Sequence, residues 1–186
     1  MSTVNGSLPR VSTILRVLDD AYAGVPQSAL DKAAERGEAL HRLCLTYLAS
    51  LGGMCEEPHA VWEGHAPAFF AFVKWCTDNQ VEPVAVEQEG VNTLNGFRGH
   101  PDALILFGPD KILVLIDLKF TAALLRINRV QVQAYWRLNL YIDASRVLLV
   151  HIRPLTGELK VHPIKKNPAD WAAFLNALSV WRWRNS

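Results

Sequence analysis

Cysteine is scarce in this chain of 186 residues, which contains three: Cys44, Cys55 and Cys76. Their spacing fits neither a zinc site nor an iron–sulfur cluster, so no such cofactor is expected. An odd cysteine count without a secretion signal is typical of a reducing compartment in which thiols stay unpaired. We therefore expect a cytoplasmic protein.

Long apolar runs and a strong net charge are also missing. No run approaches the roughly 18 residues that a membrane span requires, so no membrane partner is expected. Residues 1–8 contain no apolar segment of the kind found in signal peptides. The net charge of +1 gives the protein no overall field directed at a polyanion. It leaves a local basic face open.

What is present indicates one globular unit. Half of the residues are hydrophobic and 20% are charged, a balance typical of a folded protein rather than a disordered one. No repeat, low-complexity tract or linker divides the chain. We expect a single domain over residues 1–186, with residues 1–10 flexible or weakly docked and the last helix within residues 165–186.

Apolar periodicity predicts the helices and strands. Ser12 or Thr13, Ser28, and Asn167 followed by Pro168 are the expected helix starts. Helices are predicted at residues 11–23, 28–51, 67–79, 128–141 and 167–183. Strands are predicted at residues 81–91, 97–107, 111–120, 147–152 and 159–164. Short turns join the first three strands, which predicts an antiparallel meander, and the last two are expected to form a hairpin.

Two strands of this meander carry charged residues inside apolar runs. Asp117 and Lys119 are two residues apart, so both side chains leave the same face, while Leu118 points into the other layer. A charged group in such a strand needs a partner or a metal ion. Asp102, on the preceding strand, lies about as far from the connecting turn as Asp117. The two carboxylates are therefore expected side by side.

This pair predicts a metal site. Two carboxylates and the backbone carbonyl of Leu118 suit Mg²⁺ or Mn²⁺, which prefer oxygen ligands. Such an ion lowers the pKa of a bound water, and Lys119 would orient that water or stabilise developing negative charge. The alternative is an ordinary Asp–Lys pair on a half-exposed strand. The apolar flanks and the presence of Asp102 argue against it.

Two helices carry further candidates. Gln131 and Tyr135 are four residues apart, hence on one face, and Arg126, Arg129 and Arg137 are near them in the sequence. This group could hold a DNA backbone near the metal. A solvated amphipathic helix is the alternative.

His41 lies beside the apolar stripe of its helix and shares a face with Glu38. Taken alone, it is best interpreted as a partly buried core histidine.

The ordered set of His41, Asp102, Asp117-Leu118-Lys119 and Gln131-x-x-x-Tyr135 resembles the PD-(D/E)XK nuclease superfamily, and within it the RecB-type and phage exonuclease branch. Residues 35–41 are similar to the branch's RG-x-x-x-H helix. Residues 97–102 are similar to its G-x-x-D strand, and residues 11–15 to the opening of its phage members. The resemblance covers roughly residues 11–164.

The resemblance implies an α/β, restriction-endonuclease-like fold, with a central mixed sheet flanked by helices. It implies His41, Asp102 and Asp117 as ligands of Mg²⁺ (or Mn²⁺) and Lys119 as the catalytic lysine. Gln131 and Tyr135 would lie near the substrate, and Glu38 or Glu89 would add an outer contact to the metal site or a contact to a second metal ion. No iron–sulfur cluster is expected, because the cysteines that hold it in some members are absent.

The predicted function is a Mg²⁺-dependent DNA nuclease, an exonuclease of phage or prophage type acting in recombination or repair in the bacterial host cytoplasm. We expect it to act alone or as one subunit of a complex. A homo-oligomer and a recombination or replication partner protein both stay open. The alternatives are a catalytically silent nuclease-like fold that binds DNA or assists assembly, a structure-specific endonuclease, and an RNA-cutting toxin.

Overall fold

The protein is described here by a computed structural model that covers residues 8–18, 26–58 and 61–186. Its helices are α1 Val11–Leu15, η1 Arg16–Leu18, α2 Gln27–Leu51, η2 Glu63–His65, α3 Ala66–Asp78, α4 Arg126–Tyr135 and α5 Pro168–Arg184. Its strands are β1 Glu82–Val86, β2 Gly90–Asn92, β3 Phe97–Gly99, β4 Ala103–Phe107, β5 Ile112–Lys119, β6 Arg146–Ile152 and β7 Leu159–Ile164. In the described part of the chain, no helix is long and apolar enough to cross a membrane.

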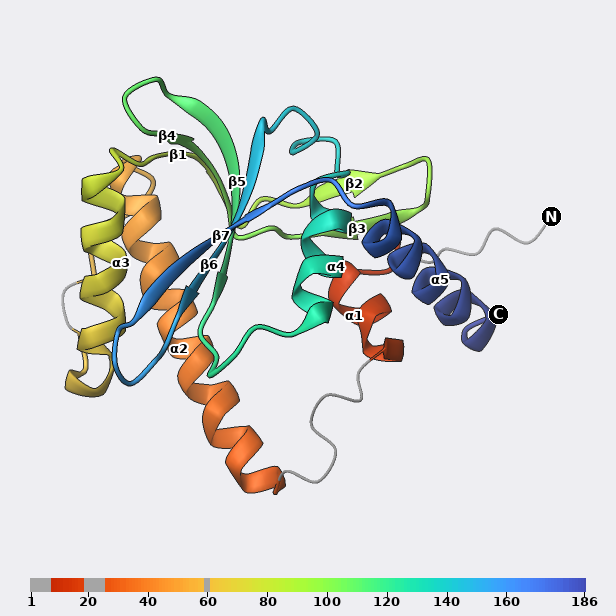
Figure 1. Cartoon of the computed structure of the whole chain (residues 1–186), viewed down its shortest axis with the longest axis horizontal. Coiled ribbons are helices and arrows are strands. Elements are labelled where there is room, and N and C mark those ends of the chain that lie inside the picture. The colour runs from red at the N-terminus through yellow and green to blue at the C-terminus, as the bar shows by residue number, and fades with distance from the viewer. Residues whose placement is uncertain (1–7, 19–25, 59–60) are drawn as a thin grey trace.

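A five-stranded sheet in the order β1-β4-β5-β6-β7 forms the centre of the molecule. Strands β5 and β6 are parallel and the other neighbours are antiparallel, so the sheet is mixed. Helix α4 lies in the crossover from β5 to β6, as a parallel pair requires. Helices cover both faces (Figure 1). The predicted α/β fold with a central mixed sheet flanked by helices is therefore confirmed.

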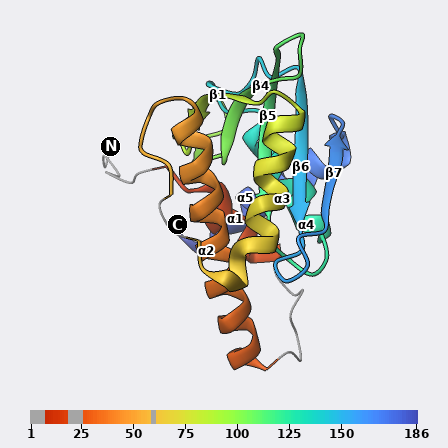
Figure 2. The same ribbon diagram turned by 90° about the vertical axis from the view of Figure 1, so that its left-hand side faces the viewer.

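The two faces of the sheet carry separate apolar cores. Alternate residues of β5, Val114, Ile116 and Leu118, pack with α2 and α3. Leu115, between them in sequence, packs with α1, α4 and α5 on the other face. Figure 2 shows α2 and α3 lying over the first face. Successive side chains of β5 therefore point alternately into the layer of α2 and α3 and into the layer of α1, α4 and α5.

The predicted strand over residues 97–107 is wrong, because the structure divides it between two sheets. Strand β3 pairs with β2 in a separate two-stranded sheet, and β4 belongs to the central sheet. Pro101 stands in the break, where its missing N–H cannot continue a ladder. The predicted strand over residues 81–91 divides in the same way into β1 and β2. The β2–β3 hairpin is thus inserted into the expected meander, between β1 and β4.

Several predicted ends also differ. Neither α1 nor α2 has a side-chain cap; their N-caps are Arg10 and Pro26, so Ser12, Thr13 and Ser28 lie inside the helices. The helix expected over residues 128–141 spans Arg126–Tyr135. The cap at Asn167 is confirmed, since its side chain accepts hydrogen bonds from the N–H groups of Ala169 and Asp170.

Only part of the N-terminal prediction can be compared with the structure. Residues 1–7, expected to be flexible, and residues 19–23 of the first helix lie outside the described residues. Residues 8–10 are docked on β3: the Arg98 side chain donates to the carbonyl of Leu8 at 2.8 Å, and its N–H donates to that of Pro9 at 3.0 Å.

The turn between β6 and β7 packs against the start of α3, and two glycines allow this contact to be tested. Gly157 has φ +70°, and a Cβ there would overlap the carbonyl of Pro67. Gly108, in the β4–β5 turn, has φ +73° with open space around it. We predict that Gly108→Ala costs about 1–2 kcal/mol of unfolding free energy from backbone strain alone. Gly157→Ala should cost roughly 1–3 kcal/mol more, because the turn must move off α3.

Urea denaturation of the two variants beside the unmodified protein measures this difference. Equal losses would mean that the turn does not pack on α3.

Candidate active site

The β4–β5 hairpin places two carboxylates side by side. Ala103 pairs with Ile116, so one step further along the same register Asp102 comes opposite Asp117. Asp102 lies just before β4, and its Oδ2 accepts a hydrogen bond of 2.5 Å from the N–H of Leu118. The exposed fractions of Asp102 and Asp117 are 7% and 1%. The predicted register is therefore confirmed, although Asp102 is outside the strand.

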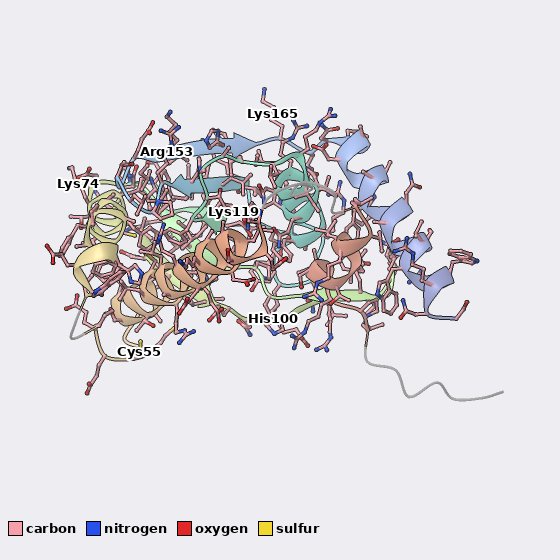
Figure 3. The ribbon with its side chains drawn as sticks, turned by 90° about the horizontal axis from the view of Figure 1, so that it is seen from below. Cys55, Lys74, His100, Lys119, Arg153 and Lys165 are labelled. Carbon is pink, nitrogen blue, oxygen red and sulfur yellow. The ribbon has the colours of Figure 1, made fainter. Side chains whose placement is uncertain are left out.

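Two basic side chains contact these carboxylates. Lys119 Nζ lies 2.5 Å from Asp117 Oδ2, and His41 Nε2 lies 3.0 Å from Asp102 Oδ1. His41 comes from α2, so the two core layers both contribute to the site. Figure 3 shows Lys119 between α2 and α4. The structure thus brings together His41, Asp102, Asp117 and Lys119, a set we call the acidic cluster.

Asp117 is the least satisfied member of the acidic cluster. Neither of its buried carboxylate oxygens has a partner in hydrogen-bonding geometry among the described residues, although the Lys119 ammonium is in ion-pair contact. Burial raises the pKa of Asp117 to about 6; Lys119 opposes this shift, and the charge of Asp102 adds to it. The ionised form of Asp117 is therefore destabilised in the folded protein.

Asp102 has the opposite balance. Burial alone would raise its pKa, but the hydrogen bond and charge of His41, together with Lys119 and the Leu118 N–H, hold the pKa below its ordinary value. Burial would lower the pKa of His41, and Asp102 raises it above the ordinary value. Likewise, the pKa of Lys119 is raised against the effect of burial by Asp117 and Asp102. The two aspartates thus differ in charge preference because they differ in partners.

Tyr135 of α4 faces the acidic cluster. It accepts a hydrogen bond of 3.0 Å from Gln131 Nε2, as the shared helix face predicts. Its ring packs against Gly99, where a Cβ would come within 2.8 Å of the ring. Burial raises its pKa, and the charges of Asp117 and Asp102 raise it further. The Tyr135 hydroxyl therefore stays protonated and can donate a hydrogen bond.

The three arginines do not share the face of Gln131 and Tyr135. Arg129 forms an ion pair with Asp170 of α5 at 2.8 Å. Arg137 donates to the carbonyl of Gln133 at 2.6 Å and stacks over Trp171, 4.3 Å from the ring centre. Arg126 is exposed at the first turn of α4. That these arginines bind DNA stays a prediction, and the structure separates them from the Gln131–Tyr135 pair.

Glu38 and Glu89, which were predicted to contact the metal site, each form ion pairs with neighbouring side chains. Glu38 pairs with Arg42 at 3.3 Å on the exposed side of α2. It lines a cavity of about 240 Å³ together with His41 and Lys119. Glu89 pairs with Arg98 at 2.6 Å and with His100 at 3.3 Å. Their proposed contact with a metal ion stays a prediction.

Glu87 is a residue that the sequence analysis missed. Its N–H donates to the carbonyl of Asp102 at 2.9 Å, and its φ of 48° marks where the chain leaves β1. Its carboxylate adds to the effect of Asp102 on the pKa of His41. The alternation along residues 84–89 put Glu87 and Glu89 on one face, and it did not indicate which of them approaches the cluster.

The donor atoms of the acidic cluster fit a hard divalent cation. The Asp117 carboxylate is buried beside a second carboxylate, and among the described residues its oxygens are in close contact only with the Lys119 ammonium. Within the described residues, no group of three or more His, Cys, Asp or Glu side chains is already arranged as a metal site. In this arrangement Lys119 supplies a positive charge, and His41 supplies a second one when it is protonated. That the carbonyl of Leu118 acts as a ligand stays a prediction.

Comparison with known proteins shows similarity to solved structures only. No protein-family model matches the chain, and no curated protein matches it in sequence. The chain is similar to the crystal structure of SSO0001, with a TM-score of 0.50 and 17% identity over 100% of this chain and 80% of that one. It is also similar to the crystal structure of an alkaline exonuclease, LHK-Exo, from Laribacter hongkongensis. That TM-score is 0.47, with 16% identity over 96% of this chain and 87% of that one. At these identities the similarity concerns the fold alone.

The opposite pKa shifts of the two aspartates predict opposite effects on stability. The pKa of Asp117 lies above its unfolded value, so its ionisation opposes folding, with no cost below about pH 4 and the full cost above about pH 7. In metal-free buffer, Asp117→Asn should raise the unfolding free energy by about 1–3 kcal/mol at alkaline pH, and less as the pH falls to about 4.

Asp102 is the matched control for this measurement. Its pKa lies below its unfolded value, so it stabilises the fold above that value and Asp102→Asn should lower stability at neutral pH. Urea titrations of both variants across this pH range, with EDTA, test the pair. A loss for Asp117→Asn that grows with pH would identify Asp117 as a structural partner of Lys119.

Proposed function

We propose that this protein is a metal-dependent DNA nuclease, a phosphodiester hydrolase that uses Mg²⁺ or Mn²⁺. The observation that carries the proposal is Asp117, a buried carboxylate beside a second one, whose close partner among the described residues is the Lys119 ammonium alone. A buried, incompletely paired charge is costly. A bound divalent cation would remove that cost, and two adjacent carboxylates are the donors it prefers.

The residues have distinct roles in this proposal. Asp102 and Asp117, with His41 and the carbonyl of Leu118, would hold the ion. When bound, the ion supplies a water of lowered pKa and neutralises charge on the scissile phosphate. Lys119, which is 2.5 Å from Asp117 and keeps its proton, would orient the attacking water or stabilise charge that develops on the phosphate.

Tyr135 and Gln131 would position the substrate. The Tyr135 hydroxyl accepts from Gln131 and keeps its own proton, so that proton is free to be donated to a phosphate oxygen. A contact of this kind fixes the phosphate in line with the attacking water, where an error of about 1 Å is costly. The motif order described above favours an exonuclease of phage or prophage recombination or repair, with DNA as the partner and the cytoplasm as the location.

A second function is favoured by one observation. The described residues pair Asp117 with Lys119 and Asp102 with His41, an arrangement in which each carboxyl group already has a basic side chain as its partner. A nuclease-like subunit that binds DNA or assists assembly without cleaving it would need no more than this. The two functions differ in whether the protein binds a metal ion and cleaves DNA in its presence.

Cleavage of end-labelled linear DNA and of closed-circular DNA tests the proposal directly. We predict cleavage in Mg²⁺, none in EDTA, and none for Asp117→Asn, because the variant keeps the shape of the site and loses the ionised ligand. Loss of label from linear DNA with intact circles would identify an exonuclease. Lys74→Gln, on the exposed side of α3, is the control that should keep full activity. If the protein leaves both substrates intact while its thermal unfolding remains normal, the silent subunit is favoured.

Metal binding separates the roles of Lys119 and Asp117. Lys119 is a cation in contact with a ligand, so Lys119→Ala should keep or increase the affinity for Mn²⁺ while cleavage falls. Asp117→Ala should lose both, because it removes a ligand. Calorimetric titration of the two variants measures the affinities without any need for turnover. Equal loss of Mn²⁺ binding would mean that Lys119 acts by positioning Asp117.

A further inference from the structure

A row of side chains connects Asp117 to a second cavity on the same face of the sheet. Asp117 pairs with Leu149 of β6, and Leu149 pairs with His162 of β7. Residues paired in register share a face, so His162 lies two strand spacings from Asp117, about 10 Å across the sheet. His162 lines a cavity of about 730 Å³ between the first turn of α4 and the segment that joins β7 to α5.

The lining of this cavity is basic. Its charged and titratable side chains are Arg126, Arg129, His162, Lys165, Lys166 and a single carboxylate, Asp170. Asp170 is paired with Arg129. Lys166 lies 4.9 Å from the ring centre of Trp136. A local excess of positive charge is therefore present, which the net charge of +1 for the whole chain conceals.

Two of these cations are free to meet a ligand. Within the part of the chain that the structure describes, Arg126 and Lys165 have no acidic partner, and both side chains are exposed. Figure 3 shows the Lys165 side chain at the β7 edge of the molecule, on the same edge as Arg153. Replacing either residue removes charge without breaking an ion pair.

His162 indicates that the cavity is built for a polar ligand. Its Nε2 is buried and lacks a hydrogen-bond partner among the described residues. Buried polar atoms are nearly always paired, so an unpaired one beside a cavity points to a missing partner. His151, whose ring is 6.2 Å from that of His162, is paired in register with Lys119; it is buried, and its Nε2 lies 2.8 Å from the carbonyl of Thr121.

The backbone N–H groups at the start of α5 are not free to bind an anionic ligand in this cavity. The N–H groups of Ala169 and Asp170 already donate to the Asn167 side chain, so the helix start has few amides to offer. Side-chain cations, separated from one another across the cavity, suit the spaced charges of a sugar–phosphate backbone. The distance of about 10 Å from Asp117 to His162 corresponds to about three nucleotides along one strand of a duplex.

We propose that this cavity binds the phosphate backbone of the nucleic-acid strand whose scissile phosphate lies at the acidic cluster. The inference rests on the proposed function, and it adds a substrate path that runs from Lys119 over His151 and His162 to Arg126 and Lys165. Arg137 is not part of this path, because its side chain is stacked on Trp171.

The test compares two double variants that lose the same charge. Arg126→Gln with Lys165→Gln changes the cavity. Lys74→Gln with Lys111→Gln changes an exposed lysine of α3 and a half-buried lysine of the β4–β5 turn, which pair with Asp78 and Glu82 and lie away from the proposed path. Binding of a short fluorescein-labelled duplex is followed by anisotropy in EDTA over a range of salt concentrations. Cleavage in Mg²⁺ is measured separately.

We expect roughly tenfold weaker binding by the cavity variant, with a salt slope that is smaller by about 1 to 2, and little change for the control. Equal binding by both variants, or no binding by the unmodified protein, overturns the inference.

If the unmodified protein cleaves DNA and both double variants bind DNA equally well, the proposed nuclease function is supported and the proposed substrate path is refuted. Selective loss of binding in a protein that never cleaves would establish the cavity and refute the nuclease.

Discussion

The contact between Asp102 and the N–H of Leu118 sets the geometry on which the acidic cluster depends. It joins the segment before β4 to the end of β5, and it fixes a carboxylate of one strand against the backbone beside Asp117. With that oxygen engaged, the other oxygen of Asp102 faces His41 of α2. Asp117 is left with Lys119 as its close partner. One backbone hydrogen bond therefore distributes the two cations between the two carboxylates, and their pKa shifts follow in opposite directions.

The insertion of the β2–β3 hairpin places Asp102 where the chain re-enters the central sheet. The carbonyl of Asp102 still accepts a hydrogen bond from the N–H of Glu87, and Ala103 pairs with Val86 of β1, so pairing with β1 ends at this point. The chain leaves the central sheet after β1 and re-enters it at Ala103. Glu87, with φ 48°, and Pro101 mark the two crossings. The irregular backbone lies beside the titratable groups, where departures from regular structure are often found.

The sequence predicted correctly which side chains share a face of a strand or helix and which residues pair across the β4–β5 hairpin. It did not predict which sheet a strand joins or which way the arginines of α4 point. Strand residues two apart share a face, which gave the common face of Asp117 and Lys119. Equal distance from the turn placed Asp102 opposite Asp117. Helix residues four apart share a face, which gave the contact of Gln131 with Tyr135. The division of residues 97–107 could not be read from the apolar pattern, because that pattern does not say which sheet a strand joins; Pro101 was a local sign of the break. The position of the arginines relative to Gln131 depends on helix rotation: Arg129 is two residues from Gln131, and such residues point to opposite sides of a helix. Nearness in sequence had been taken for nearness in space.

The distribution of charge gives the molecule two regions with different energetic costs. In the acidic cluster, charge is buried and one carboxylate is held with its pKa raised to about 6, so stability is lost there in the absence of a cation. At the β7 edge, positive charge is exposed, solvated and inexpensive, and it contributes little to the fold. A single anionic strand that crossed both regions with its metal ion would relieve the first and engage the second. Because both regions lie on one face of one rigid sheet, their separation is fixed by strand spacing and does not depend on loop movement.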